Sequence, residues 1–355
     1  MRREIAFRYR LLRDGGFCAW LQASENRDPT IRMDTGAEIK MSFTADFLPE
    51  ALDADGNAVE INWFSDEIQP VLILDGVEHN LGVFMPATPK DSDDGVSRRV
   101  GVEAYDRCWR VRDTNSAGLL YWPAGTLYLD AVEQLLVEAG IGIVIKTPTD
   151  AVFAEAREDW DVGTSYLTVV NQLLGEINYN PLWFNAEGAA ILEPVSVPDA
   201  SAIDHILDAS DPETCVLPGI SRETDVYSAP NVFIAICANP DKEGLMAATA
   251  KNENPQSPLS VQRRGRQICQ VTQVDNIADQ DALQAYADKL RDDSVITGET
   301  VRVATALLPG WGVADVVGLC YGEVTALCIE RAFEMQLAVG GKMTHTLEKV
   351  VYQLD

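Results

Sequence analysis

The chain has 355 residues, of which 46% are hydrophobic and 23% charged, as in ordinary folded proteins with enough apolar side chains for two or three domains. Fifty-five acidic residues against 28 basic ones give a formal net charge of −27, which argues against an outer surface that grips a phosphate backbone. Two interpretations of this charge remain open, a solubility adaptation or a surface that stays clear of nearby DNA.

Cysteine and histidine usage indicates a reducing compartment and no metal site. The seven cysteines are odd in number and no pair has C-x-x-C spacing, which is typical of buried free thiols. The three histidines lie far apart, without an H-x-x-x-H pattern, at His79, His205 and His345. No apolar run has signal-peptide character or approaches the roughly 18 residues of a membrane span. We therefore expect a chain that is cytosolic when made, with no metal or other cofactor and no membrane insertion.

Residues 1–108 have the pattern of short β-strands. Apolar side chains alternate with polar ones in the segment that contains Ile31, Met33, Ile39, Met41 and Phe43. A tight turn at Asp75-Gly76 then joins a strand to a return strand through Phe84. Short strands separated by turn signals are typical of a small barrel or sandwich, and we expect a first β-barrel here.

Residues 109–195 predict a compact α+β module. Apolar residues recur at three- and four-residue spacing over 129–139, and Gly140 ends this predicted helix. A second amphipathic helix is expected within 164–177, with Thr164-Ser165 at its N-cap. A hairpin follows within 181–194.

Residues 196–355 predict a second β-barrel with a helical and loop insertion at about 239–295. The apolar run 232–237 is expected to be a fully buried strand of this barrel. Residues 239–265 are rich in Asn, Pro, Lys and Gln and predict a mobile excursion, and a helix is expected from the capping residue Asp279. The predicted fold class is α+β, mainly β, with two barrels on either side of the α+β module.

No catalytic motif stands out. Carboxylates are paired at 93–94, 159/161 and 292–293, but such pairs are more often solvated surface than the facing carboxylates of a glycosidase. The segment 91–95 resembles a calcium loop but lacks the Glu at position twelve. G-x-S-x-G, P-loop and G-x-G-x-x-G patterns are absent. We therefore predict no catalytic, cofactor-binding or metal-binding residues and no enzymatic activity.

Aromatic residues around the central module are candidates for an assembly interface. Tyr105, Trp109 and Trp160, with Trp63 in the first barrel, fit core or interface anchors better than platforms for sugars or single-stranded nucleic acid. Where the first barrel ends, we expect the Tyr105 ring to pack inward and the Asp106 carboxylate to point outward.

One basic cluster interrupts the acidic sequence. Arg263, Arg264 and Arg266 lie within four residues of one another, in the predicted excursion. A loop of this kind fits contact with DNA or with a neighbouring acidic subunit, and it fits a solvated surface equally well. We include all three arginines among the interface candidates.

Several stretches resemble phage tail and baseplate hub proteins, a family related to the late control D and VgrG N-terminal hubs. The similarity follows the same order over most of the chain, and each short piece is degenerate. The matching stretches are 102–113, 121–132, 160–179, 182–188, 279–287, 308–317 and 340–347.

The resemblance implies a structural subunit with two tube-like barrels, of which three copies form a pseudo-six-fold ring. Such a homotrimer joins a hexameric tail tube or distal tail protein to a tip, spike or fibre protein, meets the tape-measure protein, and conducts DNA during ejection without binding it specifically. The implied location is the virion, at the tail tip or baseplate, after assembly in the host cytoplasm. Because the chain ends shortly after the second barrel, we do not expect the spike, lysozyme or peptidase extensions of some relatives. The alternatives are a tail-associated cell-wall hydrolase and the hub of a contractile injection or secretion machine.

Overall fold

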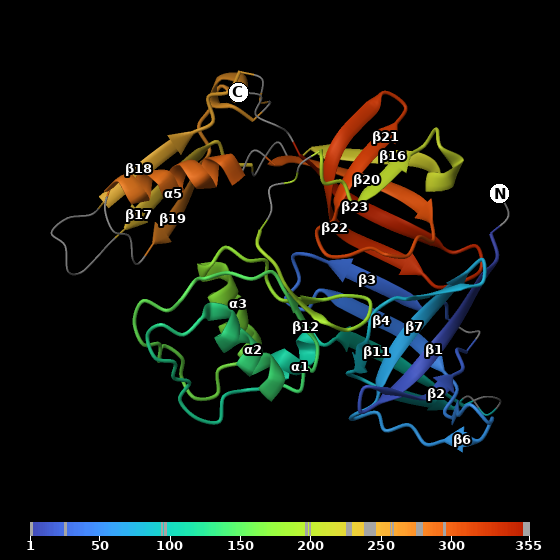
Figure 1. The fold of residues 1–355 in the computed structure, drawn as a ribbon. Helices are drawn as coiled ribbons and strands as arrows, with labels where there is room; N and C mark the ends of the chain where they lie inside the picture. The colour runs from blue at the N-terminus through green and yellow to red at the C-terminus, as the bar shows by residue number, and fades with distance from the viewer. Residues whose placement is uncertain are drawn as a thin grey trace.

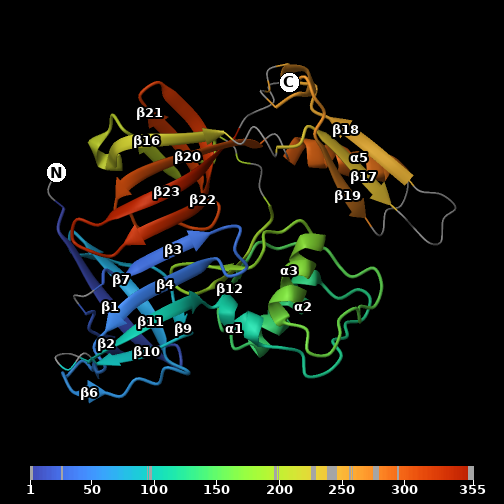
Figure 2. The same cartoon turned by 180° about the vertical axis from the view of Figure 1, so that it is seen from behind.

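The computed structural model describes residues 3–24, 27–93, 95, 98–195, 198, 200–224, 229–237, 246–255, 257, 259–274, 280–293 and 296–350. An N-terminal β-module (blue) lies beside a C-terminal β-module (red), with a central module (green) next to them and an inserted module (orange) set apart (Figure 1). The view from behind agrees with this arrangement (Figure 2). The predicted fold class, α+β and mainly β, is confirmed.

The N-terminal β-module is a run of antiparallel strands. They are β1 (Ile5–Arg13), β2 (Gly16–Leu21), β3 (Thr30–Asp34), β4 (Met41–Phe47), β5 (Ala51–Leu52), β6 (Ala58–Val59), β7 (Glu67–Leu74), β8 (Val77–Asn80), β9 (Phe84–Pro86), β10 (Lys90–Asp93) and β11 (Arg98–Asp106). β1 pairs with β2 and β7, and pairing continues from β7 through β9 and β11 to β4. A bridge between Ala23 and Phe47 connects the end of β2 to β4. The predicted Asp75-Gly76 turn is confirmed between β7 and β8, and both residues have positive φ.

The predicted alternation in β3 and β4 is confirmed, with one exception. Ile31, Met33, Met41 and Phe43 are buried in the core of the N-terminal β-module. Ile39 instead packs against the core of the central module. It precedes β4, where the chain has left the ladder, so strand alternation does not determine which way its side chain faces.

The C-terminal β-module joins the same sheet. Its strands are β15 (His205–Asp208), β16 (Val216–Thr224), β20 (Ile296–Ala306), β21 (Val316–Tyr321), β22 (Val324–Gln336) and β23 (Lys342–Val350), with the short 3₁₀ helix η1 (Pro212–Thr214) after β15. β22 pairs with β21, with β23 and, across the module boundary, with β3. The two β-modules therefore form one continuous sheet of 17 strands in the described part of the chain.

We call the β3–β22 pairing the seam. Met33 lies opposite Phe333 and Ile31 opposite Met335, and all four side chains are buried in one core. On the solvent side, Arg32 Nε lies 2.8 Å from a carboxylate oxygen of Glu334 on β22. The backbone bonds continue past both ends of the ladder, from Leu337 N to Pro29 O and from Thr35 N to Arg331 O. Main-chain pairing and apolar burial thus both connect the two ends of the sequence.

The central module contains α1 (Cys108–Asp113), α2 (Tyr128–Glu138), α3 (Tyr166–Glu176), β12 (Val144–Lys146), β13 (Trp183–Phe184) and β14 (Ala190–Leu192). The two predicted helices and the predicted hairpin are confirmed as α2, α3 and β13–β14. Gly140 has φ 81° just beyond α2, as expected of a residue that ends a helix. Ser165 is the N-cap of α3, but its hydroxyl donates to Arg112 O and makes no capping bond. The domain boundaries near residues 108 and 195 stay predictions.

The inserted module has its own sheet. It comprises β17 (Val232–Cys237), β18 (Met246–Lys251), α4 (Val261–Arg264), β19 (Cys269–Val274) and α5 (Gln280–Asp293). The apolar run 232–237 suggests a strand of the second barrel, whereas β17 pairs with β18 and β19 and with no other strand in the described part of the chain. Its apolar face is covered by α5, and a run of this length cannot indicate which element covers it. Asp279 lies outside the described residues. Among the residues described, none of the helices is long and apolar enough to cross a membrane.

The expected orientation at the end of β11 is wrong. Asp106 is 2% exposed, and its carboxylate accepts hydrogen bonds from Met41 N and Cys108 N. Tyr105 is half-buried, and its hydroxyl donates to Glu103 Oε1 at 2.7 Å. The physical reason is that Asp106 satisfies two main-chain N–H groups at the turn from β11 into α1, where a carboxylate stabilises more than an aromatic ring.

The seam can be tested by comparing two adjacent residues of β22. Phe333→Ala is expected to lower the free energy of unfolding by about 3–5 kcal/mol, because it leaves a cavity in the shared core. Glu334→Ala removes only the exposed pair with Arg32 and is expected to cost less than about 1 kcal/mol. Urea denaturation of both variants measures the difference, and equal losses would contradict a core shared across the seam.

Asp106 predicts a pH dependence of stability. Burial raises the pKa of Asp106 to about 6, above its ordinary value of 3.8. The folded chain therefore binds the proton more tightly, so this contribution to stability is full below pH 3.8 and is lost as the pH rises through 6. At ~1.4 kcal/mol per pKa unit, the loss is about 3 kcal/mol.

The measurement is urea denaturation of the wild type and Asp106→Asn from pH 4 to 8. The free energy of unfolding of the variant, minus that of the wild type, is expected to rise with pH. Asp91→Asn is the control: hydrogen bonds with Arg98 hold the Asp91 pKa below its usual range, so Asp91 stays ionised from pH 4 to 8 and the difference for this variant is expected to be independent of pH. A difference for Asp106→Asn that is independent of pH would contradict the prediction.

Candidate assembly interfaces

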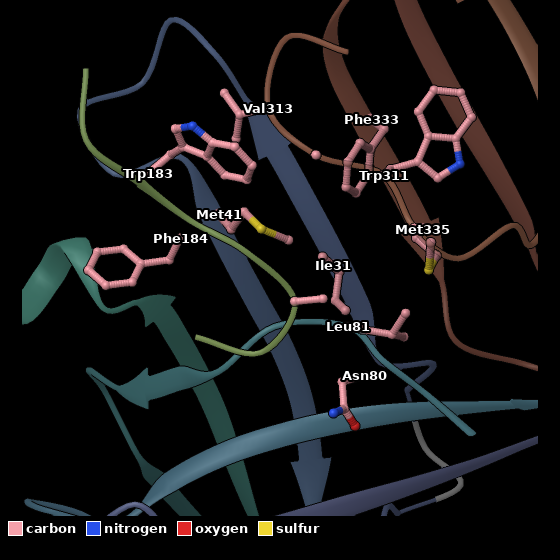
Figure 3. A pocket seen from close by; sticks show the side chains of 13 residues that line it. Ile31, Met41, Asn80, Leu81, Trp183, Phe184, Trp311, Val313, Phe333 and Met335 are labelled. Atoms are coloured by element: carbon pink, nitrogen blue, oxygen red, sulfur yellow. The ribbon is translucent and has the colours of Figure 1, made fainter. Parts of the chain in front are cut away.

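Three modules meet around a small apolar pocket. Figure 3 shows Trp183 of the central module on one side and Phe333 and Trp311 of the C-terminal β-module on the other. Ile31 and Met41 of the N-terminal β-module lie between them. The cavity is about 30 Å³, little more than the volume of a water molecule, and most of its lining is apolar. We interpret it as a packing junction rather than as a ligand site.

A buried polar network adjoins this junction. Glu330 and His345 are both 0% exposed, with His345 Nδ1 2.8 Å from Glu330 Oε2 and Nε2 3.0 Å from Thr305 Oγ1. The Trp311 ring contacts the rings of both His345 and His205 at centroid distances of 4.4 and 3.9 Å.

The Glu330–His345 pair carries no net charge at neutral pH. Burial raises the pKa of Glu330 well above its usual range, and burial together with the charge of His205 lowers the pKa of His345 to about 3. The Glu330 carboxyl then donates to His345, which donates to Thr305. Because both side chains are fully buried, this pair does not contact a substrate.

The aromatic interface candidates lie in different environments. Trp160 is 6% exposed, in the core of the central module, and its Nε1 donates to Gln172 Oε1. Trp63 is half-buried and packs against the core of the N-terminal β-module. Neither side chain presents much free surface to a partner.

Tyr105 and Trp109 form a half-buried stack. Their rings are 4.8 Å apart and nearly parallel, and the guanidinium of Arg112 lies 4.2 Å from the Trp109 ring centre. This stack of two rings and a cation lies at the connection between β11 and α1. An interface role for this pair stays a prediction.

The arginine candidates lie in and just after α4. Arg263 and Arg266 are exposed, whereas Arg264 is half-buried and donates to Ala229 O. Residues 239–265 also contain β18 and α4, where the sequence predicts a mobile excursion. Within the described part of this segment, Asn252 donates to Ser257 Oγ and Ser260 Oγ accepts from Arg263 N. Residues 239–245, 256 and 258 lie outside the described residues.

Phe64 is an exposed residue that the sequence does not single out. Its side chain is 98% exposed, in a turn where Asn62 Oδ1 accepts from Phe64 N and Asp66 accepts from Arg13 and Asn62 N. A turn has no alternation, so the sequence cannot indicate whether Trp63 or Phe64 packs inward.

The carboxylates among the described residues do not assemble into a reactive site. Asp106 and Glu330, whose pKa values are raised, are both fully buried in separate modules. Asp91 and Asp159 are exposed partners of Arg98 and Arg157. Asp94 of the calcium-like loop lies outside the described residues. Within the described ranges, no group of three or more His, Cys, Asp or Glu side chains could hold a metal ion.

Comparison with known proteins identifies the fold. No protein-family model matches the sequence, and no curated protein does. A tail protein from Neisseria meningitidis matches with a TM-score of 0.66 at 13% identity, over 97% of this chain and 96% of the other. A prophage MuSo2 43 kDa tail protein from Shewanella oneidensis matches with a TM-score of 0.67 at 10% identity, over 96% and 98%.

A third structure extends the likeness beyond phage. It is an Escherichia coli component of the type VI secretion system, described as structurally similar to the T4 bacteriophage tail proteins gp27 and gp5. It matches with a TM-score of 0.51 at 13% identity, over 100% of this chain and 78% of the other. The resemblance noted in the sequence is thus confirmed at the level of the fold: this chain has the fold of the phage tail and baseplate hub proteins.

Proposed function

We propose that this chain is a structural subunit of a phage tail hub, of which three copies form a pseudo-six-fold ring. The observation that carries the proposal is the seam, through which two β-modules of one chain lie side by side in one sheet. Three such chains supply six β-modules. A ring that alternates N-terminal and C-terminal β-modules can therefore match a six-fold tube on one side and a three-fold tip on the other.

The charge of the chain fits a ring around DNA. A net charge of −27 repels a phosphate backbone, so DNA passes through the opening without being held. The fold likeness to tail proteins supports a role without enzymatic activity. The partners in this proposal are the hexameric tail tube or distal tail protein, the tape-measure protein and a tip, spike or fibre protein. The location is the tail end of the virion, after assembly in the host cytoplasm.

A second candidate is the hub of a contractile injection or secretion machine, since the fold likeness includes a type VI secretion component. Neighbouring genes distinguish the two: capsid and tape-measure genes support a phage tail, and an effector cluster supports a secretion machine. A cell-wall hydrolase gains no support from the buried carboxylates, and clearing of peptidoglycan in a zymogram would revive it.

Particle geometry tests the ring. The purified chain, alone or added to tail-tube hexamers, is expected to have three times the subunit mass of 38.9 kDa by light scattering. Electron microscopy should resolve a three-fold ring with six β-modules around one opening. A chain that remains a monomer or a closed dimer under both conditions would exclude the proposal.

A further inference from the structure

The inserted module has a sheet that is covered on one face only. Ala235 and Ala248 pack against Leu283 and Ala287 of α5. Strand alternation places Ile234 and Ile236 of β17 on the other face, with Val271 of β19 beside Ile234. Val271 is 59% exposed, and Ile234 and Ile236 are half-buried. The described residues thus include an open sheet face with an apolar centre.

A buried group of hydrogen bonds fixes the loop at one end of this sheet. Asn231 is 0% exposed, and its amide donates to Leu259 O and Arg266 O while its Oδ1 accepts from Ile268 N. Asn252 is 3% exposed and donates to Ser257 Oγ. The loop that carries the arginines is therefore held in one conformation by buried polar side chains.

The loop presents positive charge on an acidic protein. Residues 246–274 contain Lys251, Arg263, Arg264 and Arg266 and a single acid, Glu253, whereas the whole chain has a charge of −27. Arg263 and Arg266 are exposed, and neither side chain has an ion-pair partner among the residues described. Arginines elsewhere are commonly paired, as Arg13 is with Asp66 and Arg107 with Glu67. The backbone at these two arginines is thus held by hydrogen bonds, and their charges are uncompensated within the described part of the subunit.

We propose that the inserted module is a docking arm that binds an acidic surface of a second copy of this chain. Arg263 and Arg266 make the ionic contacts, and the open sheet face beside them, centred on Ile234 and Val271, covers apolar surface. The inference rests on the proposed function for the presence of adjacent copies.

Charge complementarity selects this occupant. Two strongly acidic copies repel each other except where one presents its basic loop, so the loop also sets their relative orientation. The two surfaces in contact differ, and a heterologous contact of this kind can close a ring. Because the loop is already ordered, little conformational entropy is lost on docking. Double-stranded DNA fits less well, since the net charge of −27 repels the phosphate backbone and the loop exposes only Arg263 and Arg266 to contact it.

The experiment compares assembly of the full-length wild type and R263E/R266E by sedimentation velocity in low salt. R263E/R266E is expected to weaken self-association by at least about 100-fold, with unchanged circular dichroism and melting temperature. Val271→Asp tests the open face independently and is expected to weaken association as well, because it places a charge in the apolar contact.

Two controls make the result specific. R263K/R266K keeps both charges and is expected to weaken association by less than about 10-fold. K90E/K342E changes the net charge by the same amount at two exposed lysines outside the inserted module, and it is expected to assemble like the wild type. If K90E/K342E weakens self-association as much as R263E/R266E does, the docking arm is overturned, and the net charge of the chain explains the loss instead.

The outcomes separate the arm from the ring. A wild-type chain that does not self-associate overturns the proposed function and the arm together. A wild type and an R263E/R266E variant that assemble equally overturn the arm alone. Equal assembly combined with DNA binding by the wild type only, measured by gel shift, assigns the loop to nucleic acid instead.

Discussion

The architecture depends on the seam between β3 and β22. These strands lie about 300 residues apart in the chain, and their ladder joins two β-modules into one sheet. One apolar core includes Met33 and Phe43 from the first part of the sequence and Phe333 and Met343 from the last. Neither β-module can move relative to the other without breaking main-chain hydrogen bonds and opening that core. A stiff pair of β-modules is the unit that a ring of copies requires.

Buried polar groups fix how the modules meet. The Asp106 carboxylate accepts a hydrogen bond from Cys108 N where β11 turns into α1. A nearly buried ion pair between Arg107 and Glu67 connects this turn to β7. Glu330 and His345 occupy the C-terminal β-module beside the pocket. Burying such groups costs solvation energy, so their contribution lies in selecting one arrangement rather than in adding stability. This is consistent with a protein whose work is to hold a geometry.

The net negative charge of the chain and the positive charge of the loop around Arg263 and Arg266 are complementary. A chain with a charge of −27 resists association and also resists sticking to DNA. Copies of it can assemble only where local contacts overcome that repulsion. The exposed arginines of the inserted module and the exposed Phe64 are the features that could supply such contacts. In the proposed function, specific assembly and passage of DNA would both follow from this distribution of charge.

The fold class, the strands β3 and β4, the helices α2 and α3 and the family resemblance could all be predicted from the amino-acid sequence. The strands and helices are predictable because one face of each is buried at a regular spacing of neighbouring residues. The three-dimensional structure was needed to show that β3 pairs with β22, that β17 belongs to a separate sheet, and that Asp106 turns inward. It also decided that Phe64 rather than Trp63 is exposed. Each of these depends on which distant segment covers a residue or satisfies its polar groups, and no local pattern encodes that choice.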